Sequence, residues 1–160
     1  MNNDYSLLFQ KRTDNVAYDL QDDFSFVCTR IEPGDIGFKD LEENNWADED
    51  GNDVYFPNKM RLKSFELKVD VAYTGVVDSH QGALSYFLDY ITGIYADGIR
   101  LYSKRLNKGY KGVYLKSISD QRLYKTETDE VYECVLTFEI TDPISPVSAK
   151  KNGSFYTLIN

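Results

Sequence analysis

The stretch KSFELKVDVAY, residues 63–73, decides the fold class. Apolar and polar side chains alternate along it. Successive side chains of a β-strand point to opposite faces, so a period of two gives the strand one apolar and one polar face. The stretch therefore predicts a half-buried strand whose apolar face covers a core, formed by Phe65, Leu67, Val69, Val71 and Tyr73.

A second strand with the same period is predicted at residues 131–141, VYECVLTFEIT. Asp142-Pro143 is expected to end it, because proline has no N–H to donate to a strand ladder. Shorter strands are expected at 98–103 and 110–118. A further alternating segment lies within residues 18–29, where Phe24, Phe26 and Cys28 share a face.

One amphipathic helix is predicted at residues 79–92. Asp78 is the expected cap, with Gln81 completing a box-like pair, and Gly93 is the expected stop. The apolar face comprises Ala83, Leu84, Phe87, Leu88 and Ile91. Together the patterns predict an α+β fold: a mostly antiparallel β-sandwich or rolled sheet with one packed α-helix.

The length of 160 residues fits a single domain, residues 1–160. Three segments are expected outside its core: an N-terminal arm (1–15), an acidic loop (40–53) and an extended C-terminal tail (144–160). Ordering them costs about 1–2 kcal/mol per residue, which is comparable to what their few apolar side chains return. We therefore expect subunit contacts at these residues, the alternative being that the segments fold back on their own domain: Leu7, Leu8, Phe9, Trp46, Phe155, Tyr156, Leu158 and Ile159.

The acidic loop contains a pattern that resembles a calcium site, since Asp48, Asp50 and Asn52 alternate. The calcium-loop template requires glycine where Asp53 stands and glutamate where Lys59 stands. We interpret the stretch as a solvated acidic loop with Asp50-Gly51 as a candidate hairpin tip.

The composition argues against an enzyme. The one histidine, His80, has no second histidine as partner and is interpreted as an exposed or cap-region residue. Cys28 and Cys134 lack CxxC spacing, so they exclude a zinc site on ligand count and are expected to be free thiols, with a disulfide as the alternative. We predict no catalytic centre, no metal and no organic cofactor.

A net charge of −8 argues against nucleic-acid binding by phosphate neutralisation. The basic run at residues 104–111 is interpreted as a solvated turn. No stretch approaches the roughly 20 apolar residues that a membrane helix needs, so no membrane contact is expected.

The order of these elements resembles the N-terminal ring domain of distal tail proteins and related tail-tube-like proteins of long-tailed bacteriophages. The residues that carry the resemblance lie between Arg61 and Pro143, about half the chain. They are the strand at 61–73, the helix through Leu84 and Leu88, the run YKGVYL (110–115) and the run VLTFEITDP (135–143).

The resemblance implies a structural virion protein of the phage tail, assembled in the cytoplasm of the bacterial host. It implies a homo-oligomeric ring, hexameric in such proteins, around a channel that DNA crosses without specific binding. It also implies contacts with other tail or baseplate proteins. The alternative is a carbohydrate-binding β-sandwich module, in which Trp46, Tyr55 and Phe56 form a stacking platform.

Overall fold

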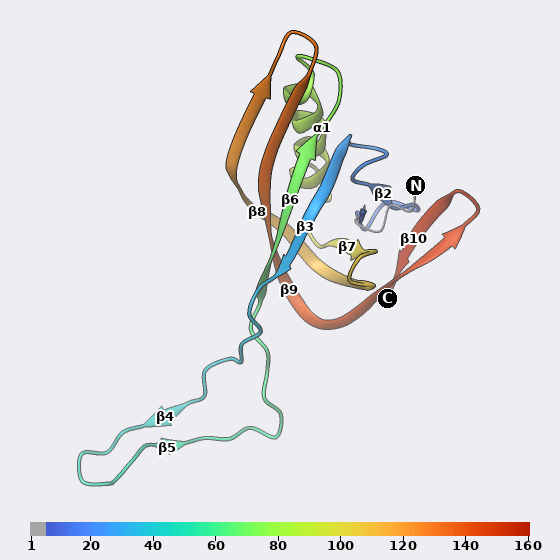
Figure 1. The fold of residues 1–160 in the computed structure, drawn as a ribbon. Coiled ribbons are helices and arrows are strands. Elements are labelled where there is room, and N and C mark those ends of the chain that lie inside the picture. The colour runs from blue at the N-terminus through green and yellow to red at the C-terminus, as the bar shows by residue number, and fades with distance from the viewer. Residues whose placement is uncertain (1–5) are drawn as a thin grey trace.

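The computed structural model describes residues 6–160 (Figure 1). Eight strands form one sheet in the order β2-β1-β7-β8-β9-β6-β3, with β10 paired to β9, and β4 and β5 form a separate two-stranded pair. All pairs are antiparallel. The elements are β1 (Leu7–Gln10), β2 (Tyr18–Asp19), β3 (Phe26–Pro33), β4 (Glu43–Asn44), β5 (Asp53–Val54), β6 (Phe65–Tyr73), α1 (His80–Thr92), β7 (Ile99–Ser103), β8 (Lys108–Lys125), β9 (Glu130–Asn152) and β10 (Phe155–Ile159).

The two strongly alternating strands pair with each other at the centre of the sheet. In the β6–β9 register, Leu67 faces Phe138 and Val69 faces Leu136. All four side chains are buried. Cross-strand apolar pairs of this kind are the unit of sheet stabilisation, so both predicted strands are confirmed together with the apolar faces assigned to them.

The predicted helix is confirmed, and its apolar face packs onto the core. Phe87 and Ile91 are buried, and the Phe87 ring lies 5.2 Å from that of Phe24 and 5.8 Å from that of Phe9, centroid to centroid. The helix ends at the C-cap Gly93, a position that requires glycine because a Cβ atom there would lie 2.3 Å from the Asp89 carbonyl oxygen. Over residues 6–160 the fold is therefore α+β and mostly antiparallel with a single helix, as the sequence predicts.

The predicted helix cap is wrong. Ser79 occupies the N-cap position and makes no side-chain cap bond. The backbone N–H of Asp78 donates to the carboxylate of Glu130, which also bonds Nδ1 of His80. Glu130 comes from β9 and is buried. A side chain distant in the sequence therefore accepts a hydrogen bond at the start of the helix, where a local cap residue usually supplies the acceptor. The His80 ring stacks on Tyr132 and is largely covered, so the cap-region interpretation holds and the exposed one does not.

Strand β9 continues past Asp142-Pro143, contrary to the expected end there. Its pairing with β8 jumps from Lys111↔Asp142 to Gly109↔Val147, so the segment 143–146 bulges out of the ladder. Residues in such a bulge need not donate to the neighbouring strand, which is why two prolines are tolerated.

The expectation that residues 1–15 form an arm outside the core is wrong for the described part, and residues 1–5 lie outside the described residues. Leu7–Gln10 is strand β1, between β2 and β7. Leu7 and Phe9 belong to the main core, while Leu8 packs with Val147 and Leu158 on the other side. A strand covered on both faces has a continuous apolar run and no alternation.

Cys28 and Cys134 are free thiols. Both face Val71 of β6, one from β3 and one from β9. Strands two positions apart lie about 9 to 10 Å from each other, whereas a disulfide needs Cα atoms within about 7 Å. The sheet therefore excludes the disulfide alternative.

Removing the Glu130 carboxylate should destabilise the fold. Glu130→Ala removes the acceptor of the Asp78 N–H and the partner of His80 Nδ1, whose ring is largely covered, and an unsatisfied covered group costs about 1–3 kcal/mol. Glu127→Ala, at an exposed position nearby, is the control and should change the unfolding free energy by less than about 0.5 kcal/mol. Urea unfolding measures both; equal midpoints would refute the cap role.

Both thiols should resist modification in the folded protein. Burial raises the pKa of Cys28 and of Cys134 to about 11, so at pH 8 both are neutral as well as covered. A thiol reagent at pH 8 should label neither residue within the time in which it labels both in denaturant. Rapid native labelling of either cysteine would contradict the burial.

Candidate assembly surfaces

Besides the two-residue strand β2, which ends the strand order on one side, the sheet of the described chain has two longer edges with unpaired backbone. Strand β3 ends the strand order, so one of its sides pairs with β6 and the other has no strand partner among residues 6–160. Strand β7 reaches only as far as Val113 of β8, so β8 from residue 114 to 125 has no strand on that side in the described chain. A row of unpaired N–H and C=O groups is a template for pairing with another chain.

The far end of β8 is exposed and partly apolar. It extends with β9 into a hairpin at the top of Figure 1. Leu123 is 49% exposed and Tyr124 56% exposed. These side chains flank the unpaired edge of β8, so apolar surface and free backbone groups lie together.

Residues 34–64 form a long loop between β3 and β6 that extends away from the sheet (Figure 1). This loop is called the arm from here on and is distinct from the N-terminal segment 1–15. The bridge Phe38↔Leu62 and the β4–β5 pair hold its two limbs together. Gly51 has φ +84° between β4 and β5, so Asp50-Gly51 is the hairpin tip that the sequence predicts. No residue of the arm is buried, and its exposed large apolar side chains are Ile36, Phe38, Trp46, Tyr55, Phe56 and Met60.

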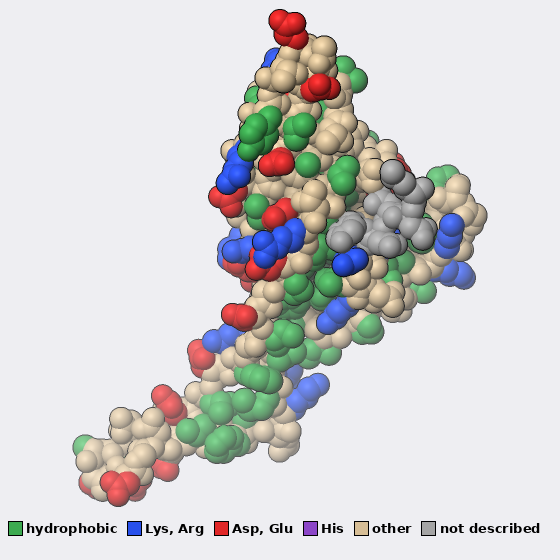
Figure 2. All heavy atoms as spheres, viewed as in Figure 1, with side chains coloured by type: hydrophobic (Ala, Val, Ile, Leu, Met, Phe, Trp, Pro, Cys, Tyr) green, Lys and Arg blue, Asp and Glu red, His purple; other side chains and the backbone are tan. Residues whose placement is uncertain are grey.

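The tip of the arm concentrates the negative charge of the chain. Seven of the 26 acidic residues lie in segment 40–53, and none of the 18 basic residues does. This segment therefore carries seven of the eight net negative charges. Figure 2 shows acidic side chains gathered at the end of the arm.

The C-terminal segment is a hairpin, β9 with β10, and not a free extended tail. Leu158 is buried, its N–H donates to Gln10 Oε1 at 2.7 Å, and its carbonyl oxygen accepts from Arg100 at 3.2 Å. One side of the hairpin thus docks on its own domain. The opposite side leaves Phe155 59% exposed and Ile159 43% exposed.

Positive charge gathers on the same hairpin. The Lys104 ammonium lies 4.6 Å from the ring centroid of Tyr156, and that of Lys151 lies 5.8 Å from it. Lys150 is the exposed neighbour of Lys151. Lys151 pairs with Tyr156, whereas Lys150 pairs with Thr157 and so projects from the other face of the hairpin. Lys104 and the two hairpin lysines, Lys150 and Lys151, are together called the basic patch below. Figure 2 shows basic side chains on this hairpin.

The basic patch joins two segments without acidic residues. Residues 98–118 contain six basic side chains and no acidic one, and residues 143–160 contain two and none. Asp19 is the acidic partner of Lys104, at 3.5 Å. The excess of basic residues is visible in the sequence of each segment. Only the folded β9–β10 hairpin, whose Tyr156 contacts Lys104, brings the two segments together.

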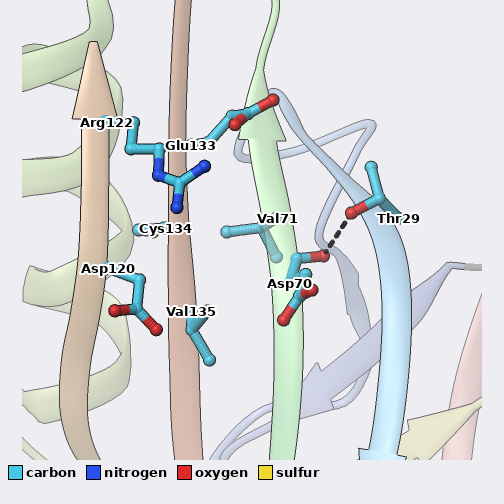
Figure 3. Close-up of a pocket in the computed structure, with 8 residues that line it drawn as sticks. All are labelled: Thr29, Asp70, Val71, Asp120, Arg122, Glu133, Cys134 and Val135. Carbon is cyan, nitrogen blue, oxygen red and sulfur yellow. Dashed lines mark hydrogen bonds between the residues drawn. The ribbon is translucent and has the colours of Figure 1, made fainter.

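A polar hollow lies across strands β3, β6, β9 and β8 on the sheet (Figure 3). Arg122 reaches over β9, with Glu133, Asp120 and Asp70 around it. Thr29 donates to the Asp70 carbonyl at 3.2 Å. Charges of both signs on an open face suit a solvated or contacting surface and offer no paired acid and base in a closed cleft.

The structure separates the eight predicted contact residues into two groups. Four are buried within the chain: Leu7, Leu8, Phe9 and Leu158. Trp46 (54% exposed), Phe155 and Ile159 are open, and Tyr156 is half-buried. The buried group corresponds to the fold-back alternative, because each docks in a sheet ladder. The contact role remains a proposal for the others.

Residues 6–160 hold no group of three or more His, Cys, Asp or Glu side chains placed for a metal. No helix among these residues has the length and apolar character to cross a membrane.

Comparison with known proteins identifies a solved structure of similar fold. No protein-family model and no curated protein sequence matches the chain. Among solved structures, the chain is similar to the crystal structure of the SPP1 Dit protein (gp 19.1), described as a paradigm of the hub adsorption apparatus in phages that infect Gram-positive bacteria. The fold resembles that of a phage Dit protein.

The match has a TM-score of 0.54 at 14% sequence identity. It covers 91% of this chain and 52% of the Dit chain, so the present chain spans about half the length of the protein it resembles. The similarity extends well beyond the half of the chain that carries the sequence resemblance. At this identity it establishes the likeness of fold, and a role in the tail is a matter for proposal.

Proposed function

We propose that the chain is a structural protein of a long-tailed bacteriophage tail, forming a homo-oligomeric ring of six copies around the DNA channel. The observation that carries the proposal is the pair of unpaired sheet edges on β3 and β8. The fold likeness to a Dit protein supports the same conclusion.

The geometry of the edges favours a ring over a dimer. The two edges lie on different strands, so the natural pairing joins β3 of one copy to β8 of the next. Such a head-to-tail contact uses two different surfaces on each copy. Repeating it gives a closed ring when the rotation closes, and a filament when it does not.

The β8 edge combines protected and open positions. Natural sheets protect free edges with prolines, charges, bulges or covering loops. Between residues 114 and 125, β8 has no proline, but it carries Lys116, Asp120, Arg122 and Lys125 and shifts its register with β9 at two places. Leu123 and Tyr124 are exposed beside this edge, so a partner chain that pairs there must also match its charges.

The other roles in the proposal follow from the same assignment. Other tail or baseplate proteins are the expected further partners, the virion is the expected location, and the chain is no enzyme. With a net charge of −8 in each copy, a ring would repel DNA that passes through it, so DNA would slide without binding.

The ring proposal predicts a discrete oligomer. Light scattering of the purified protein should give a mass of six times 18.4 kDa. Leu123→Asp/Tyr124→Asp places two charges beside the β8 edge and should lower the mass to that of the monomer. Since both side chains are about half exposed, the fold should persist by circular dichroism.

The matched control is Ile94→Asp/Tyr95→Asp, in the loop after α1. It adds the same charge at side chains 79% and 50% exposed, where the Ile94 carbonyl contacts Lys11 after β1, and should leave the oligomer intact. If light scattering shows the wild-type protein to be a monomer at all concentrations, the ring proposal is refuted. If that monomer also bound glycans on an array, the carbohydrate-binding module would replace it.

A further inference from the structure

The arm lacks the contacts that an ordered segment normally has. None of residues 34–64 is buried, and six large apolar side chains on it are open to solvent. Ordering each residue costs about 1–2 kcal/mol in backbone entropy. A surface of this kind, polar at the tip and aromatic along the limbs, is typical of one that is completed by a partner.

We propose that the arm docks on a second copy of this chain, with its acidic tip on the basic patch of that copy. This inference rests on the proposed assembly and names the contact that would accompany edge pairing. The tip supplies Asp48, Glu49 and Asp50, and the basic patch supplies Lys104, Lys150 and Lys151.

Charge complementarity selects the occupant. The tip holds seven acidic and no basic residues, while the segments that form the basic patch hold basic and no acidic residues. A chain that separates its charges in this way attracts another copy of itself in one orientation and repels it in others. A partner of one charge sign would match only one of the two surfaces, whereas a second copy of the chain matches both.

Apolar surface is present on both sides of the proposed contact. Trp46 lies close to the acidic tip in sequence and is 54% exposed. Phe155, beside Tyr156 in the sequence, is 59% exposed, and Ile144, in the bulge of β9, is 57% exposed. Ile144 also lines a hollow of about 200 Å³ with Lys108 and Pro146. Aromatic side chains in such hollows carry much of the energy of protein interfaces.

The contact must be between copies. In Figure 1 the arm leaves the sheet at the lower left, whereas the β9–β10 hairpin projects to the right. The two surfaces of one chain therefore face different directions. The arm of one copy and the hairpin of the next satisfy each other in the same head-to-tail sense as the sheet edges.

Charge exchange tests the contact. Asp48→Lys/Glu49→Lys (the tip variant) and Lys150→Glu/Lys151→Glu (the hairpin variant) should each lose the oligomer at 150 mM NaCl and run as 18.4 kDa monomers. The chain that carries all four changes should regain it. An equimolar mixture of the two variants should also assemble, because the two new lysines of the tip variant then meet the two new glutamates of the hairpin variant. The unchanged acidic tip of the hairpin variant meets the unchanged lysines of the tip variant.

The matched control separates local pairing from net charge. The tip variant combined with Arg12→Glu/Lys68→Glu has the net charge of the wild type but an unchanged basic patch, and it should stay monomeric. Both added positions are outside the patch, on β6 and on the turn after β1.

Failure of this inference is distinguishable from failure of the ring proposal. If the wild type assembles and the tip and hairpin variants assemble equally well, the edges hold the ring and the arm contact is refuted. If the four-change chain fails to reassemble, the pairing is also refuted. If the hairpin variant keeps its mass but loses retention on DNA, the basic patch serves phosphates and the inference is wrong.

Discussion

The pairing of β6 with β9 is the contact on which the rest of the fold depends. Both strands alternate with a period of two, so a slip of one residue would turn every core side chain to the opposite face. The observed register sets Leu67 against Phe138 and Val69 against Leu136. With that register fixed, β8 and β3 add on either side of the pair, and the helix closes over the apolar face.

Period-two strands and the helix were predictable because their signals are local. Phe65 to Tyr73 and the face of α1 are written in the spacing of their apolar residues. Strand β1 was not predictable in this way. Its run Leu7-Leu8-Phe9 is covered from both sides by segments far away in the sequence. The persistence of β9 beyond Pro143 likewise depends on a break in the ladder with β8, which single-strand rules do not reveal.

The residues of the candidate surfaces likewise divide into those with a local sequence signal and those placed by distant contacts. Trp46 and Phe155 are exposed, and their contact role stays a prediction, based on the need of large apolar side chains in polar segments for a partner. Leu158 has the same composition signal, yet a hydrogen bond from its N–H to Gln10 and the packing of Leu8 place it inside its own chain. The basic patch was beyond prediction, since it joins Lys104 to Lys150 and Lys151 only through the folded hairpin.

The continuity of β9 also has a mechanical meaning. Its 23 residues, about 75 Å when extended, pair with β10 at one end and with β6 and β8 at the other. A pull on the C-terminal hairpin along this strand is carried by covalent bonds into the centre of the sheet. There it loads two ladders in shear, where many hydrogen bonds resist together. The C-terminal hairpin should therefore resist a pulling force strongly. The arm is joined to the sheet through unburied loops, so it should deform at a lower force.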